Sequence, residues 1–130
     1  MAAVKKEKQT NEKILDAFFD VYFRSPKSAE FIACGGNMHI VMYKYRSWER
    51  FLKRNNYSVQ NRANTYEVVN VKKGRILMTG GLEDIAEELG ISYATARRIY
   101  VNKIIYKDAY KIVLKPFDPE LVRKAVEENG

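Results

Sequence analysis

The sequence predicts an α+β fold in which a helical N-terminal half precedes two short helices flanked by strands, with a further helix at the C-terminus. Three observations support this prediction. Apolar residues recur at helical spacing near the N-terminus, β-branched residues flank a lysine–glycine turn within 66–79, and two short helical patterns meet at Gly90. Hydrophobic residues make up 46% of the 130-residue chain, which suffices for a packed core. We therefore expect a helical region at 1–60 and a mixed domain at 65–130.

The helical region begins with a basic tail of nine residues, after which two helices are expected. Thr10 or Asn11 can cap a helix that runs to about Arg24, because short polar side chains accept hydrogen bonds from the first free amides. Pro26 can open a second helix that ends near Cys34, because the fixed φ of proline suits the first helical position. The first helix carries its apolar residues on one face: Ile14, Leu15, Phe18, Phe19 and Tyr22.

The stretch 38–54 carries apolar residues at 3–4 spacing, and we expect one long helix there. This helix would place Arg46, Arg50 and Lys53 together on its opposite face. The β-rich segment HIVMYKY leaves an alternative open, namely a strand followed by a shorter helix that Ser47 caps.

Three aromatic residues of the same stretch, Tyr43, Tyr45 and Trp48, alternate with basic residues. This pattern also occurs in proteins that stack the bases of single-stranded nucleic acid. Their helical register favours packing in the core instead.

The second region follows a polar linker at 55–64 and is expected to alternate strands and helices. Its first two strands form a hairpin that turns at Lys72-Lys73-Gly74. Pro116 ends the last strand, and Asp118-Pro119 opens the final helix. The expected elements are strands at 66–71, 75–79 and 109–115 and helices at 82–89, 92–101 and 119–128.

The segment GLEDIAEELGISYATARRIY has the pattern of a helix-turn-helix. Ala86 is small enough for two helix backbones to approach, and Gly90 tolerates the left-handed geometry that a tight turn needs. Ser92 can cap the second helix. Five apolar residues then face inward: Ile85, Leu89, Ile91, Ala96 and Ile99. A helical hairpin that only packs, or that docks a protein, would use the same pattern.

Charge separates the two helices of this motif. The inward-facing residues leave Tyr93, Ala94, Arg97 and Arg98 on the outer face of the second helix, whereas the first helix carries an acidic face. The chain has a net charge of +7, and its basic residues gather at 44–62 and 90–115. A positive surface favours phosphate-rich partners, although positive charge also serves solubility. The acidic face comprises Glu83, Asp84, Glu87 and Glu88.

Several classes of protein are disfavoured by residue counts. The single histidine, His39, and the single cysteine, Cys34, are too few for a zinc site. Cys–His catalysis is disfavoured because only one histidine is available and Cys34, beside Gly35, is expected to be a small buried hydrophobic residue. No glycine-rich phosphate loop is present, and no apolar run approaches the roughly 20 residues of a membrane-spanning helix. We expect a protein without enzymatic activity, metal or cofactor, located in the cytoplasm.

The block from Tyr66 to Leu114, YEVVNVKKGRILMTGGLEDIAEELGISYATARRIYVNKIIYKDAYKIVL, resembles small DNA-binding proteins of phages and mobile elements. It is also similar to the modular DNA-binding repeats of homing endonucleases, in which a short hairpin leads into a helix-turn-helix and a closing strand follows. The resemblance implies DNA contacts by Ser92, Tyr93, Arg97 and Arg98. Further candidates for DNA contact are Thr95, Lys103 and Lys107, and in the helical region Arg46, Arg50 and Lys53.

We therefore expect a sequence-specific binder of double-stranded DNA that regulates transcription in the cytosol of a bacterial host. The alternative is an anti-defence inhibitor, similar to anti-CRISPR proteins, that binds a host defence protein or ribonucleoprotein through its basic surfaces. Regulators usually pair across a two-fold axis, so we also expect a homodimer. Its seam is expected to include part of an aromatic face: Ile14, Phe18, Phe19, Tyr22 and Phe23.

Overall fold

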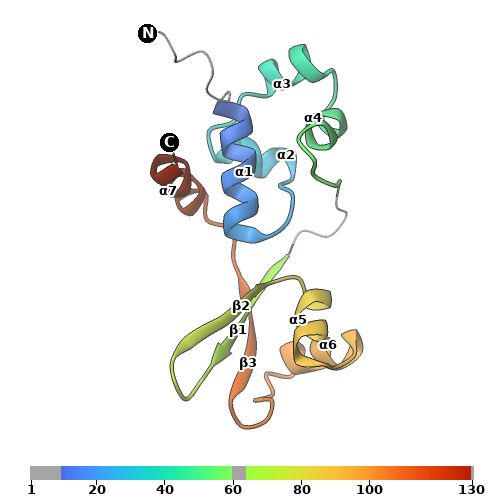
Figure 1. Cartoon of the computed structure of the whole chain (residues 1–130), viewed down its shortest axis with the longest axis vertical. Helices are drawn as coiled ribbons and strands as arrows, with labels where there is room; N and C mark the ends of the chain where they lie inside the picture. The colour runs from blue at the N-terminus through green and yellow to red at the C-terminus, as the bar shows by residue number, and fades with distance from the viewer. Residues whose placement is uncertain (1–9, 60–63, 130) are drawn as a thin grey trace. The chain divides into compact units, whose positions relative to one another are not determined.

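The computed structural model describes residues 10–59 and 64–129 and confirms the α+β class (Figure 1). The described residues hold seven helices and one three-stranded antiparallel sheet. The chain divides into two compact units. We call residues 10–21, 25–59 and 117–129 the helical unit, and residues 22–24 and 64–116 the sheet unit. The predicted tail and residues 60–63 of the predicted linker lie outside the described residues.

The helical unit joins four helices of the N-terminal half to the last helix of the chain. The prediction placed this last helix in the 65–130 domain, whereas its contacts lie in the helical unit. Arg123 Nη2 donates a hydrogen bond to the carbonyl oxygen of Ala33 at 2.9 Å, and the Phe117 ring lies 5.9 Å from that of Phe18. The helices are α1 (Thr10–Tyr22, with Tyr22 counted in the sheet unit), α2 (Ser28–Ala33), α3 (Met38–Tyr45), α4 (Trp48–Arg54) and α7 (Pro119–Asn129).

Aromatic rings form much of the core of the helical unit. The Phe31 and Phe51 side chains are fully buried, and their ring centroids lie 5.4 Å apart in an edge-on arrangement. Trp48 lies 5.1 Å from Phe31 and 5.3 Å from Phe51, and Tyr45 lies 5.0 Å from Phe51. Tilted ring pairs at these separations are stabilising beyond their apolar area.

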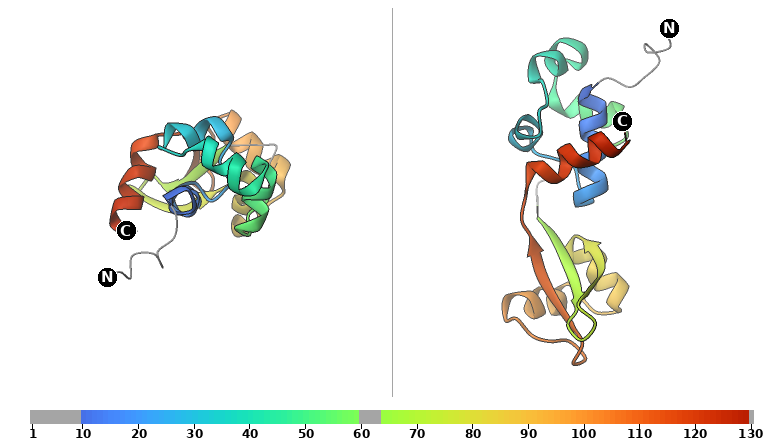
Figure 2. Two further views of the ribbon diagram at one scale, coloured as in Figure 1. Left: turned by 90° about the horizontal axis from the view of Figure 1, so that it is seen from above. Right: turned by 90° about the vertical axis from the view of Figure 1, so that its left-hand side faces the viewer.

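The prediction of one long helix at 38–54 is wrong, because the chain turns between α3 and α4 (Figure 2). Arg46 adopts a left-handed conformation with φ of 75°, and the Ser47 hydroxyl accepts a hydrogen bond from the Arg50 amide at 3.1 Å. Ser47 is therefore a helix cap, as the alternative had it, although the preceding segment is a helix and not a strand. The turn lets both Tyr45 and Trp48 pack against Phe51.

The tight contact between Gly36 and the buried Phe31 ring leads to a prediction about stability. A Cβ atom at Gly36 would lie 2.3 Å from Phe31 Cε2, so Gly36→Ala should lower the free energy of unfolding by about 1–3 kcal/mol through overpacking. Chemical denaturation measures this change. Gly81→Ala is the control, because its Cβ would meet only the Asp84 side chain at 3.8 Å. Equal losses in the two variants would contradict the overpacking argument.

The predicted dimer seam is largely used by the chain itself. Ile14 and Phe18 are 3% and 0% exposed, and Tyr22 is also buried, so their surface is not available to a partner. Among the five residues only Phe23 is clearly exposed, at 49%. The aromatic face is therefore mostly core, and the homodimer stays a prediction that this face does not support.

The sheet unit carries its helices on one face of the sheet (Figure 1). The strand order is β2-β1-β3, with a bulge in the β1–β2 pairing next to Val68. Val68 and Ile112 lie opposite each other in β1 and β3 and pack with the apolar residues of both helices. The elements are β1 (Thr65–Asn70), β2 (Arg75–Gly80), α5 (Leu82–Leu89), α6 (Tyr93–Val101) and β3 (Tyr110–Lys115).

None of the helices in the described part of the chain is long and apolar enough to cross a membrane. Cys34 is buried at the end of α2, and this burial raises the pKa of its thiol to about 11. The thiol is therefore protonated at neutral pH, a state in which cysteine is a poor nucleophile.

Candidate nucleic-acid interface

The turn between α5 and α6 has the geometry that the sequence predicts. Gly90 adopts a left-handed conformation with φ of 70°, which glycine takes without steric cost. The Ile91 amide donates to the Ala86 carbonyl at 2.9 Å, and this bond closes the C-terminal end of α5. A single left-handed residue thus sets the angle at which α6 leaves α5.

Ser92 and Thr95 together form the N-terminal cap of α6. The Ser92 hydroxyl oxygen accepts from the Thr95 amide at 3.1 Å, and the same hydroxyl donates to Thr95 Oγ1 at 2.9 Å. Both hydrogen-bonding roles of Ser92 are therefore used within the cap. The Thr95 hydroxyl accepts in this pair, so its own proton can still be donated to a ligand.

We expect Ser92→Ala to lower the free energy of unfolding by about 1 kcal/mol, because it leaves the first amides of α6 without an acceptor. Hydrogen exchange should show the loss of protection in the first turn of α6. Ser47→Ala removes the equivalent cap of α4 and is the control, since it should leave exchange in α6 unchanged. Unaltered protection of α6 in Ser92→Ala would contradict the role assigned to this cap.

The buried face of α6 fixes the direction of its two arginines. Ala96 and Ile99 are 0% and 3% exposed and belong to the core of the sheet unit. Ala94, Arg97 and Arg98 are exposed on the remaining surface of the helix, as predicted. Neither arginine forms an ion pair with a carboxylate of the described residues. The two guanidinium groups therefore lie at the surface without a carboxylate partner in the described part of the chain.

Tyr93 departs from the prediction that it faces outward. Its side chain is half-buried and packs against the core of the sheet unit. The helical spacing places Tyr93 at the edge of the apolar face. A large ring at such an edge stabilises the fold, because it removes apolar surface of the core from water. Tyr93 was predicted on the outer face of α6, but it belongs partly to the core.

The acidic face of α5 is present and solvent-exposed. It consists of Glu83, Asp84, Glu87 and Glu88. Within the described ranges, histidine, cysteine and acidic side chains do not gather in any group of three that could hold a metal ion. The carboxylates of the motif are thus confined to its first helix, and its second helix carries only positive charge.

Lys103 and Lys107 lie in the connection from α6 to β3, and both are exposed. Lys103 has φ of 56° and Lys107 has φ of 53°, values in the left-handed region that lysine rarely adopts. The Ile104 amide donates to the Ile99 carbonyl at 3.0 Å, which closes the C-terminal end of α6, and the left-handed Lys103 follows the C-cap residue Asn102. Both lysines thus lie at the surface, in a backbone conformation that lysine seldom adopts.

The basic residues predicted on α3 and α4 do not share one helix. Arg46 ends α3, Arg50 lies on α4, and Lys53 Nζ forms an ion pair with Glu49 Oε2 at 2.9 Å. Hydrogen bonding to Lys53 lowers the pKa of the Glu49 carboxyl, which is consistent with this pairing. The three charges thus do not form the acid-free helical face that the sequence predicted.

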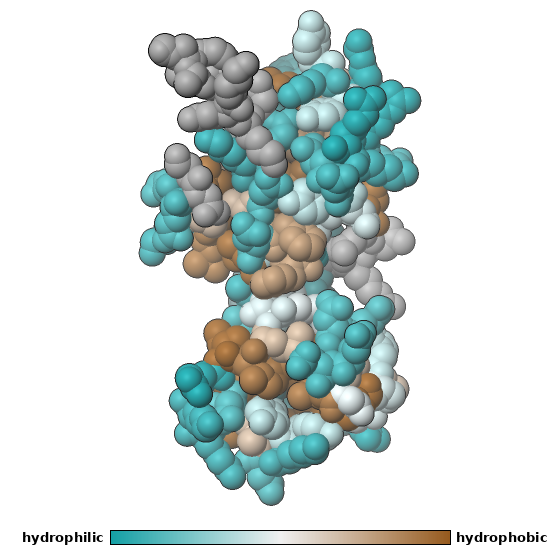
Figure 3. Space-filling view, viewed as in Figure 1, coloured by the Kyte–Doolittle hydropathy of each residue, from teal (hydrophilic) through white to brown (hydrophobic). Residues whose placement is uncertain are grey.

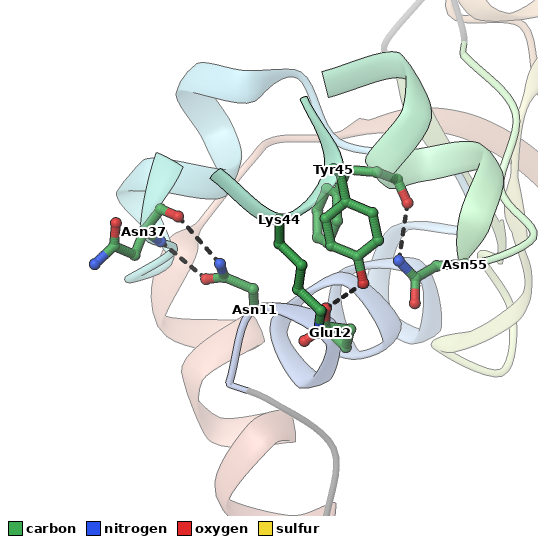
Figure 4. Close-up of polar contacts among 7 residues, drawn as sticks. Asn11, Glu12, Asn37, Lys44, Tyr45 and Asn55 are labelled. Carbon is green, nitrogen blue, oxygen red and sulfur yellow. Dashed lines mark hydrogen bonds and ion pairs between the residues drawn. The ribbon is translucent and has the colours of Figure 1, made fainter. Parts of the chain in front are cut away.

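Polar contacts hold α3 against α1 in the helical unit (Figure 4). The Tyr45 hydroxyl donates to Glu12 Oε2 at 2.5 Å, and Lys44 Nζ lies 3.4 Å from the same oxygen. The Asn37 amide donates to Asn11 Oδ1 at 2.9 Å, and Asn11 Nδ2 donates to the Asn37 carbonyl at 3.0 Å. These contacts use Lys44 in an ion pair, which reduces the free positive charge of this region.

The sequence-based prediction did not include two exposed lysines of the β1–β2 hairpin, Lys72 and Lys73, among the site residues. They were assigned only to the turn. The Val71 amide donates to the Ala109 carbonyl at 2.7 Å, which brings this hairpin close to the segment that contains Lys107. The pairing of β1 with β3 is what shows that the segment with these two lysines lies beside the segment with Lys107.

Comparison with known proteins does not add a family to this description. The chain matches no protein-family model, no curated protein and no solved structure.

Proposed function

We propose that the chain binds double-stranded DNA in a sequence-specific manner and that α6 enters the major groove. One observation carries this proposal. Arg97 and Arg98 are exposed on the second helix of a helix-turn-helix, and the burial of Ala96 and Ile99 fixes the side of the helix on which they lie. They have no carboxylate partner among the described residues.

The chemistry of these side chains suits the major groove, which admits an α-helix. A guanidinium group can donate two parallel hydrogen bonds to the O6 and N7 atoms of guanine. Ala94, exposed on the same helix, offers a methyl group that can contact the methyl group of thymine. The acids of the motif are confined to α5, so α6 itself presents no carboxylate to the phosphates.

We infer a regulatory role of the type found in phages and mobile elements, because a protein that occupies one DNA site can block or recruit the transcription machinery. Binding through side chains on a rigid scaffold needs no metal or cofactor. Arg97, Arg98, Lys103 and Lys107 are the residues for which we propose direct contact with DNA, and Ser92 supports them as the helix cap.

Selection from a library of random-sequence duplexes tests the proposal. The wild-type chain should enrich a short motif that contains guanine, and a variant with both Arg97→Ala and Arg98→Ala should enrich none. Lys124→Ala, which removes an exposed charge from α7, should enrich the wild-type motif. If the wild-type chain binds no duplex, or enriches no motif, the proposed function is wrong.

A second candidate function, the binding of a host protein, is favoured by the outer face of α3. Tyr43 is 82% exposed, so the prediction that it packs in the core is wrong, and Ile40 and Met42 are 45% and 47% exposed. Exposed tyrosine and methionine side chains are common at protein interfaces. Under this function, Tyr43→Ala would abolish capture of one particular protein from a nuclease-treated host lysate, while affinity for DNA would stay unchanged.

A further inference from the structure

Two loops meet at one end of the sheet, beyond the last paired residues of β1 and β3. One is the hairpin turn at 71–74, and the other is the turn that precedes β3 (Figures 1 and 2). Asn70 lies opposite Tyr110 in the β1–β3 ladder, and the Val71 amide donates to the Ala109 carbonyl at 2.7 Å. Backbone hydrogen bonds therefore hold the two loops side by side.

The hairpin turn is held in shape by the Asn70 side chain. Its Oδ1 atom accepts hydrogen bonds from the Lys72 and Lys73 amides, each at 3.0 Å. The Gly74 amide donates to the Asn70 carbonyl at 2.8 Å, and Gly74 supplies the left-handed residue that the turn requires, with φ of 64°. Two exposed lysines thus extend from a fixed backbone.

The second turn has a lysine at its tip, in a left-handed backbone conformation that lysine rarely adopts. Lys107 and Asp108 have φ of 53° and 58°, and the Ala109 amide donates to the Tyr106 carbonyl at 3.1 Å. Two consecutive left-handed residues are typical of a type I′ turn, in which asparagine and glycine are preferred. A residue held in an unfavourable conformation is often kept for its side chain.

The end of the sheet is strongly basic, and Figure 3 shows it as hydrophilic at the lower end of the sheet unit. Five exposed cations stand against one exposed carboxylate, that of Asp108. Among the described residues none of these cations forms an ion pair. We call these five residues the tip cluster: Lys72, Lys73, Arg75, Lys107 and Lys111.

The tip cluster lies near the C-terminal end of α6. Only residues 102–106 separate the last residue of α6 from Lys107, and the six residue steps between them span at most about 22 Å. The major groove of DNA is about 12 Å wide. A loop that starts at a helix inside the groove can therefore reach the sugar–phosphate backbone along its edge.

We propose that the tip cluster binds the phosphates of the same duplex, beside the groove that α6 enters; this inference rests on the proposed function. Lysine suits the task, because its ammonium is a compact charge on a flexible stem that follows phosphates without reading bases. The two sets of cations then have different roles. Arg97 and Arg98 select the sequence, and the tip cluster supplies affinity on every sequence.

The test is a triple variant, Lys72→Ala with Lys73→Ala and Lys107→Ala, titrated with duplex DNA at four salt concentrations. The slope of log affinity against log salt should become shallower by about 2.7, at about 0.9 for each lost phosphate contact. The ratio of affinities for the selected and the random duplex should stay at its wild-type value. Replacement of the same three lysines by arginine keeps the charge and should keep the slope, as should Lys124→Ala.

Two outcomes separate this inference from the proposed function. If the wild-type chain binds DNA in an Arg97-dependent manner and the triple variant keeps the wild-type slope, the tip cluster does not contact phosphates and only this inference is wrong. If the wild-type chain binds no duplex, both are wrong.

Lys107→Gly provides a second measurement, in which the charge is removed without an expected loss of stability. Glycine adopts the left-handed conformation without strain, so this variant should melt at a higher temperature than the wild-type chain. Its slope of log affinity against log salt should become shallower by about 0.9. A higher melting temperature with an unchanged slope would overturn the role of Lys107.

Discussion

Replacing Phe51 with alanine should lower the free energy of unfolding of the helical unit by about 3–5 kcal/mol. The side chain is fully buried among Phe31, Tyr45 and Trp48, with ring centroids 5.0–5.4 Å away, so its removal leaves a cavity that three other rings line. Whole domains are stable by only about 5–15 kcal/mol, so the variant should be marginally folded.

The fluorescence of Trp48, the single tryptophan of the chain, measures this loss during denaturation, because its ring lies 5.3 Å from that of Phe51. Tyr43→Ala is the matched control in the same unit. Its ring is 82% exposed, and changes at such surface positions usually stay within about 0.5 kcal/mol. Similar small losses in both variants would contradict the assignment of Phe51 to the core.

Replacing Arg97 with alanine should weaken binding to a selected DNA site more than binding to random duplex. The loss of a bidentate contact to guanine costs about 1–3 kcal/mol, which is roughly 5- to 150-fold in affinity, and discrimination at one base position should relax. Arg98→Ala tests the neighbouring position in the same way. Competition titrations with both duplexes at fixed salt measure the two affinities.

Lys124→Ala is the control for charge alone, since it removes one exposed cation from a helix to which we assign no DNA contact. It should change neither affinity. If Arg97→Ala weakens both duplexes by the same factor, Arg97 contacts a phosphate and does not read a base.

The elements fixed by local chemistry could be predicted from the sequence. The bounds of α5 match the prediction, because Gly81 and Gly90 end its apolar pattern on both sides. The cap of α6 by Ser92 and the left-handed Gly90 also agree, since each depends on a residue type with a strong conformational preference. The hairpin is confirmed for the same reason, with its turn at Lys72–Gly74.

The features that depend on distant contacts could not be predicted. Apolar spacing continues across the turn between α3 and α4, and the packing of Trp48 against the distant Phe31 ring is a contact that this spacing does not show. We predicted α7 in the same domain as the sheet because it follows the sheet in the sequence. Arg123 of α7 instead donates a hydrogen bond to the Ala33 carbonyl at the end of α2.

The candidate site also has a part that the sequence could predict and a part that it could not. The outward direction of Arg97 and Arg98 follows from helical periodicity and is confirmed as exposure on α6. The tip cluster joins residues near 72 to residues near 107, which only the register between β1 and β3 brings together. The alternation of side chains in one strand shows which face is buried, but it does not show with which distant strand it pairs.

Methylation interference on the selected duplex tests most directly whether α6 reads the major groove. Methylation of guanine N7 blocks the atom to which an arginine donates in that groove, and it leaves the phosphates intact. We predict that methylation of at least one guanine prevents binding of the wild-type chain and that its effect disappears in Arg97→Ala or in Arg98→Ala. Binding of the wild-type chain that tolerates methylation of every guanine would contradict the account.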